Sequence, residues 1–86
     1  MRIDKFLNAV NITKRRAVAE DMLAHKVVSI NDIVVKKAKE VKIGDIITIN
    51  YLDYSDRFKV LQIPKTKSTP KSAQAEYVTK LGEKDV

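Results

Sequence analysis

Three basic residues stand side by side in the stretch "NITKRRAVAE", where a second helix is expected to begin. A helix N-terminus already carries partial positive charge, so Lys14, Arg15 and Arg16 repel one another and the helix dipole. The same place suits an anion, because backbone N–H groups and cationic side chains converge there on a phosphate. Phosphate binding is the chemistry that this cluster favours, and a solvated surface is the alternative for any short basic run.

The charge of the whole chain points the same way. The 86 residues include 17 Lys and Arg against 11 Asp and Glu, a formal net charge of +6. An excess of this kind is typical of proteins that bind nucleic acid or an anionic membrane surface. Basic residues also gather along "VVKKAKEVK" and "RFKVLQIPKTK", and residues 57–71 contain no acid. If the hairpin folds back beside the second helix, these stretches would form one basic face.

Residue types for catalysis or metal binding are scarce. The chain has no Cys, one His and two Gly, which excludes a thiolate site, a histidine pair and a glycine-rich phosphate loop. The sequence therefore predicts a protein that binds without catalysing, with no cofactor and no metal. It contains neither a signal-peptide pattern nor an apolar run of about 18 residues, so a cytoplasmic protein without membrane contact is expected.

Helices and strands must position these residues. The apolar spacing is helical from position 2 to about position 25, in two stripes separated by "NITK", with Asn11 or Thr13 as the expected start of the second helix. From Val27 to Ile63 the pattern is that of strands, and "ND" forms a hairpin-like turn between "VVSI" and "IVV". Pro64 ends this part.

The last part of the sequence is polar. We expect a domain of residues 1–64 followed by a partly ordered tail of residues 65–86, since the tail is mostly loop by composition. A helical turn or short strand is predicted near Ala73–Leu81, followed by a frayed end.

Four segments occur in a characteristic order, namely "RIDKFL", "KRRAVA", "VSIND" and "KIGDIITI". Over about the first fifty residues they resemble the RNA-binding S4 domain, also called the alpha-L motif. The resemblance implies an α+β fold in which two N-terminal helices pack on a small, mostly antiparallel sheet. It also implies that RNA lies against the second helix and the hairpin. This chain departs from the family at Arg15, where Ser is common, and at Lys26 and Asp32, where glycines usually provide a positive φ.

The chain is also similar to stand-alone S4 members associated with heat shock and with ribosome quality control. That resemblance implies structured RNA (rRNA and tRNA) and the large ribosomal subunit carrying peptidyl-tRNA as partners, bound by a monomer. The heat-shock members carry a long basic C-terminal extension. The short polar segment here favours the quality-control role.

Arg16 is predicted to be the central RNA contact, because a guanidinium group binds phosphate in a bidentate manner. The predicted RNA-binding residues are Arg2, Lys5, Lys14, Arg15, Arg16, Lys26, Lys36 and Lys37. Asp4 is interpreted as a partner of the helix dipole, with orientation of a neighbouring arginine as the alternative.

Two other functions remain open. A basic second helix also describes a helix-turn-helix DNA-binding protein, although Glu20 and Asp21 and the lack of an Asn, Gln or Arg series oppose base reading. The third hypothesis is a protein-interaction module whose charge keeps it soluble.

Overall fold

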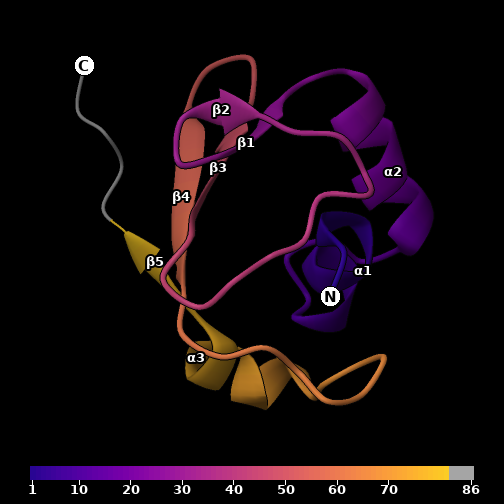
Figure 1. Cartoon of the computed structure of the whole chain (residues 1–86), viewed down its shortest axis with the longest axis vertical. Helices are drawn as coiled ribbons and strands as arrows, with labels where there is room; N and C mark the ends of the chain where they lie inside the picture. Colours follow the sequence, from indigo (N-terminus) through magenta and orange to yellow (C-terminus); the bar gives the residue numbers. More distant parts are fainter. Residues whose placement is uncertain (82–86) are drawn as a thin grey trace.

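The computed structural model describes residues 1–81, which form two helices, a sheet and a short C-terminal helix (Figure 1). The elements in chain order are α1 (Ile3–Ala9), α2 (Arg16–Ala24), β1 (Val28–Ile30), β2 (Ile33–Val34), β3 (Ile46–Asn50), β4 (Ser55–Val60), the 3-10 turn η1 (Lys71–Ala73), α3 (Gln74–Tyr77) and β5 (Val78–Leu81). Within this part of the chain the strands form a sheet of order β2-β1-β3-β4-β5, antiparallel throughout. The predicted α+β fold is confirmed.

The core lies between the helices and the sheet. On α1, Ile3, Phe6 and Leu7 are fully buried, as the helical spacing of apolar residues predicts. On β3, Ile47 and Ile49 are buried and alternate with more exposed neighbours, because successive side chains of a strand point to opposite faces. Each such side chain contributes roughly 1.5–3 kcal/mol through burial.

The segment between β2 and β3 runs from the sheet to the helices and back (Figure 1). It is fixed to the N-terminus by two backbone hydrogen bonds: the Ile3 N–H donates to the Lys39 carbonyl at 2.7 Å, and the Val41 N–H to the Met1 carbonyl at 2.9 Å. This pairing places Glu40 beside the start of α1.

The turns at Lys26 and Asp32 keep the backbone geometry that glycine usually supplies, with φ of 61° and 68°. Lys26 ends α2 in a Schellman motif, since the Lys26 N–H donates to the Leu23 carbonyl and the Val27 N–H to the Met22 carbonyl. The hairpin-like turn predicted at "ND" is confirmed, because β1 and β2 pair in an antiparallel manner on either side of it. Asn31 and Asp32 both have positive φ, as in a two-residue type I′ turn.

Glycine is therefore expected to stabilise both turns. The left-handed conformation crowds the Cβ atom, so Lys26→Gly or Asp32→Gly should each raise the free energy of unfolding by about 0.5–1 kcal/mol. Urea denaturation measures this change. The matched control is Lys39→Gly, where φ is not positive and added chain entropy should lower stability. Equal effects at all three sites would contradict the prediction.

Residues 61–81 close against α1 and the sheet. The Thr69 N–H and hydroxyl both donate to the Ala9 carbonyl, at 3.0 and 2.8 Å, and β5 pairs with β4. A helical turn or a strand was predicted near Ala73–Leu81, and the structure contains both. The predicted frayed end lies outside the described residues. The division between a domain of residues 1–64 and a tail of residues 65–86 stays a prediction.

Candidate nucleic-acid interface

A buried carboxylate joins two arginines that lie at the starts of different helices. The Asp4 side chain has no exposed surface, and its Oδ2 atom accepts hydrogen bonds from Arg2 Nη2 at 2.9 Å and Arg16 Nη2 at 3.3 Å. The other oxygen accepts the Lys5 N–H at 2.9 Å. Asp4 therefore fixes Arg2 and Arg16 relative to each other across the α1–α2 contact.

Three contacts determine the charge of Asp4. Burial by itself raises the pKa of this carboxyl, but the Lys5 N–H, Arg2 and Arg16 together outweigh burial and hold the pKa below its ordinary value. Asp4 is consequently ionised at neutral pH. It lies in the first turn of α1, as the dipole interpretation requires. Its contacts also show the alternative role, the orientation of neighbouring arginines.

The repulsion expected at the start of α2 is reduced at one residue of the cluster. Arg16 contacts Asp4 through Nη2 and Glu20 through Nε, the latter at 3.3 Å, while 48% of its side chain remains exposed. Lys14 and Arg15 are exposed and form no ion pair with another of residues 1–81. The cluster thus presents one anchored guanidinium and two solvated cations.

A groove of about 570 Å³ opens beside the arginine pair. Its lining residues are Met1, Arg2, Lys5, Asn8, Arg16, Glu40, Lys65, Thr66 and Lys67. Within residues 1–81, Glu40 is the one acidic side chain of this lining. The amino group of Met1 contacts Glu40 Oε2 at 2.8 Å and lowers the pKa of the Glu40 carboxyl. The five basic side chains therefore dominate the charge of the groove.

One wall of the groove is the exposed loop of residues 65–67, which we call the lysine loop. Pro64 and Thr69 are buried on either side of it, and Thr69 is bound to the end of α1. The sequence shows an acid-free stretch here, yet the predicted set of RNA-binding residues omits Lys65 and Lys67. Their proximity to Arg2 depends on contacts between residues about sixty positions apart.

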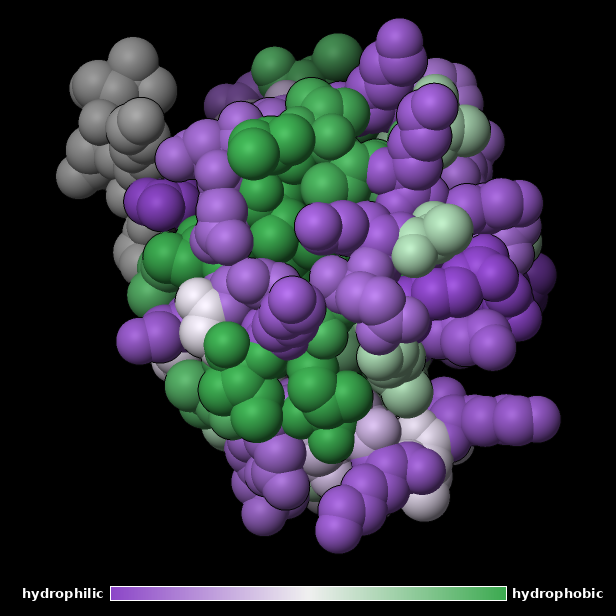
Figure 2. All heavy atoms as spheres, in the orientation of Figure 1, coloured by the Kyte–Doolittle hydropathy of each residue, from purple (hydrophilic) through white to green (hydrophobic). Residues whose placement is uncertain are grey.

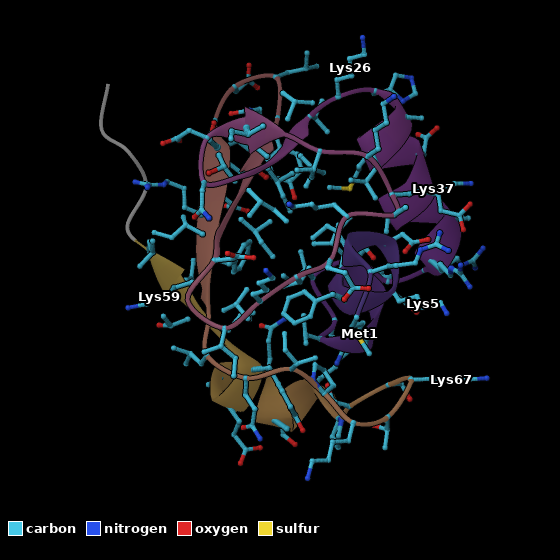
Figure 3. All side chains as sticks on the ribbon, in the orientation of Figure 1. Met1, Lys5, Lys26, Lys37, Lys59 and Lys67 are labelled. Atoms are coloured by element: carbon cyan, nitrogen blue, oxygen red, sulfur yellow. The ribbon has the colours of Figure 1, made fainter. Side chains whose placement is uncertain are left out.

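The predicted RNA-binding residues divide into several places. Arg2, Lys5 and Arg16 line the groove. Figure 3 places Lys37 beside α2, on the same side of the molecule as Lys5, and Lys26 at the end farthest from Lys67. Lys36 lines a separate depression of about 610 Å³ near β2, together with Lys39 and Lys42. The basic stretches therefore meet only in part.

The surface and composition of the site suit an anionic ligand. Hydrophilic side chains gather on the helical side of the molecule, where the groove opens (Figure 2).

Among residues 1–81, no group of three or more His, Cys, Asp or Glu side chains is placed to hold a metal ion. No helix in the same part of the chain has the length and hydropathy needed to cross a membrane.

Comparison with known proteins gives matches at the level of family, sequence and structure. The family model of the S4 domain matches residues 1–47. A protein of Helicobacter pylori strain J99, named RQC P-site tRNA stabilizing factor, is 42% identical over 78 residues, which cover 91% of this chain and 93% of that protein. A Bacillus subtilis protein of the same name is 32% identical over 75 residues, covering 87% and 84%.

Two solved structures are similar. The solution structure of the hypothetical protein HP1423 has a TM-score of 0.83 at 39% identity, covering 98% of this chain and all of that one. The trimeric structure of Vibrio cholerae Heat Shock Protein 15 also has a TM-score of 0.83, at 23% identity, covering 94% and 81%. At that identity the likeness to Heat Shock Protein 15 concerns the fold.

Proposed function

The chain belongs to the S4 domain family, and we propose that it is a non-catalytic RNA-binding protein of ribosome quality control that holds tRNA on the large ribosomal subunit. The observation that carries this proposal is the cationic groove in which buried Asp4 fixes Arg2 and Arg16. The relatives named for stabilizing P-site tRNA support tRNA as the ligand and ribosome quality control as the setting.

The geometry suits binding to phosphates without chemistry. Arg16 contacts carboxylates through Nη2 and Nε, so its Nη1 group remains available for a phosphate oxygen. Immobilising a free arginine side chain costs up to about 2 kcal/mol of conformational entropy. Because Asp4 already orders Arg16 in the unbound protein, much of that cost is removed from RNA binding. Arg2 and Lys5 extend the same cationic surface.

The remaining features of the proposal concern the binding partners, the localisation and the oligomeric state of the protein. We propose that the protein contacts both rRNA and tRNA and catalyses no reaction. We also propose that it is cytoplasmic and acts as a monomer. The comparisons give no support to a helix-turn-helix DNA-binding protein. Heat Shock Protein 15 is described as trimeric in its structure. Measuring the mass of the present protein in solution therefore tests the proposal that it is a monomer.

Gradient sedimentation of a tagged copy tests the function. The protein is expected to migrate with free large subunits that carry peptidyl-tRNA, and to bind vacant ribosomes weakly, because tRNA supplies part of the contact surface. Competition with duplex DNA and with structured rRNA provides the specificity control. Migration with small subunits, or with large subunits regardless of tRNA occupancy, would contradict the quality-control assignment.

A further inference from the structure

We propose that the lysine loop is the second wall of an RNA-binding groove and contacts the sugar-phosphate backbone through Lys65 and Lys67. This proposal rests on the RNA-binding function proposed above. The loop lies beyond residues 1–47, the part of the chain that matches the S4 domain, so the groove joins the S4 core to a separate segment. Arg2, Lys5 and Arg16 form the opposite wall.

The lysine loop is held in place on α1. At its C-terminal side, Thr69 donates two hydrogen bonds to the Ala9 carbonyl, and the Asn11 side-chain amide donates to the Thr69 carbonyl at 2.8 Å. Asn11 itself has a φ of 65°, a conformation that asparagine tolerates better than most residues. Because α1 also carries Lys5 and begins after Arg2, both walls of the groove share one support. The hydrogen bonds of Thr69 thus attach the C-terminal side of the lysine loop to the helix that supports the other wall before a ligand arrives.

The next piece of evidence for the lysine loop is the charge of the groove. Five basic side chains line it, and Glu40 is paired with the terminal amino group of Met1. In Figure 3, Lys5 and Lys67 extend from the same side of the molecule, with Met1 between them in the view. The groove has a volume of about 570 Å³, within the range of small-molecule sites, about 300–1,000 Å³. This size suits a short length of a single RNA strand.

The character of the lining favours RNA over an acidic protein. Asn8 and Thr66 add uncharged hydrogen-bonding groups, and Met1 is the apolar residue of the lining within residues 1–81. Protein interfaces usually have an apolar core enriched in aromatic residues, whereas nucleic-acid interfaces are polar and strongly positive. By the charge of its lining residues, five of which are basic, the groove resembles the second class.

The test compares two double variants with equal loss of charge. Lys65→Gln/Lys67→Gln removes both cations of the lysine loop, while Lys59→Gln/Lys71→Gln removes two exposed cations of the same acid-free stretch that do not line the groove. Figure 3 shows Lys59 on the side of the molecule away from Lys5 and Lys37. Exposed substitutions of this kind leave the fold intact.

The measured quantity is the affinity for large subunits carrying peptidyl-tRNA, over a range of salt concentrations. The loop variant is expected to lose roughly tenfold in affinity, and the slope of log K against log salt should become shallower by about 2, one unit for each phosphate contact removed. The control variant should resemble the wild type in both respects.

Several results would overturn the proposal. Equal losses in the two variants would mean that only net charge matters, and an unchanged loop variant would remove Lys65 and Lys67 from the RNA contact. Polyglutamate is used in parallel as an acidic-peptide probe. If the loop variant binds polyglutamate more weakly than the wild type but retains its affinity for RNA, the groove would be assigned to an acidic peptide. Failure of the wild-type protein to bind RNA would instead contradict the proposed function, so the two failures are distinguishable.

Discussion

Arg16→Ala is expected to weaken binding to RNA by about 1.5–3 kcal/mol, between roughly tenfold and 150-fold in affinity, because it removes a charge-assisted contact from the groove. The fold should remain, since Asp4 keeps its hydrogen bonds to Arg2 and to the Lys5 N–H. Competition binding with a structured rRNA fragment measures the loss, and circular dichroism confirms folding.

Lys59→Ala is the control for this experiment. It removes one exposed cation from β4, on another side of the molecule from Lys5 and Lys37 (Figure 3). A protein that binds RNA only through its net charge would lose the same affinity in both variants. Such equality would show that the groove is not the binding site.

Asp4→Asn is expected to weaken both folding and RNA binding. Asparagine can still accept the Lys5 N–H, but its amide hydrogens would then face two guanidinium groups that only donate. Partial exposure of both arginines allows them to hydrate, so we expect a loss of about 1–3 kcal/mol in the free energy of unfolding, measured with urea.

The RNA affinity of the Asp4→Asn variant distinguishes a role of Asp4 in positioning the arginines from an effect of net charge. Asp4→Asn makes the chain more positive by one charge, so long-range attraction alone predicts tighter binding. If Asp4 positions Arg2 and Arg16, binding becomes weaker, by about 1 kcal/mol, because the guanidinium groups must be ordered when RNA binds. The exposed Asp53→Asn is the matched control with the same charge gain, and it should bind as well as the wild type or slightly better. Tighter binding by Asp4→Asn would rule out the positioning role.

The stability of the wild type should also depend on Asp4 at acid pH. Since the pKa of Asp4 is lower in the folded protein than the ordinary value of 3.8, the carboxylate stabilises the fold above that pH. This contribution is lost as the pH falls from about 3.8 through the lowered pKa, because the unfolded chain binds the proton more readily. The Asp4→Asn variant should lose less stability over this range than the wild type does.

Local sequence patterns determined the order and type of the elements. The helical spacing of Phe6 and Leu7 and the alternation of apolar and polar residues around Phe58 and Val60 reflect the periods of a helix and a strand, which do not depend on distant residues. The turn at Asn31–Asp32 was also predictable, because Asn and Asp tolerate the left-handed conformation that a two-residue hairpin needs. The residues themselves therefore indicated the helices and strands, whereas the packing of two helices on a small antiparallel sheet was implied by the resemblance to the S4 domain.

The prediction that α2 begins at Asn11 or Thr13 was wrong, because one of these side chains is used in a tertiary contact and the other in a local one. The N-cap is Arg15, with no side-chain cap. The Asn11 amide binds the Thr69 carbonyl, and the buried Thr13 hydroxyl donates to the Arg15 carbonyl. Both side chains are used to hold the connection between α1 and α2 and its neighbouring loop, so neither caps the helix.

The net charge of +6 is a property of the sequence, and it already favours a polyanionic partner. Which cations act together depends on distances that the order of residues does not contain. Asp4 brings Arg16 to Arg2, and the Thr69–Ala9 hydrogen bonds bring the lysine loop to α1 across about sixty residues. Hydrogen bonds form over about 3 Å, and the attraction between exposed charges is largely screened beyond about 10 Å at 0.1 M salt. Only the folded chain therefore determines which basic residues form one groove.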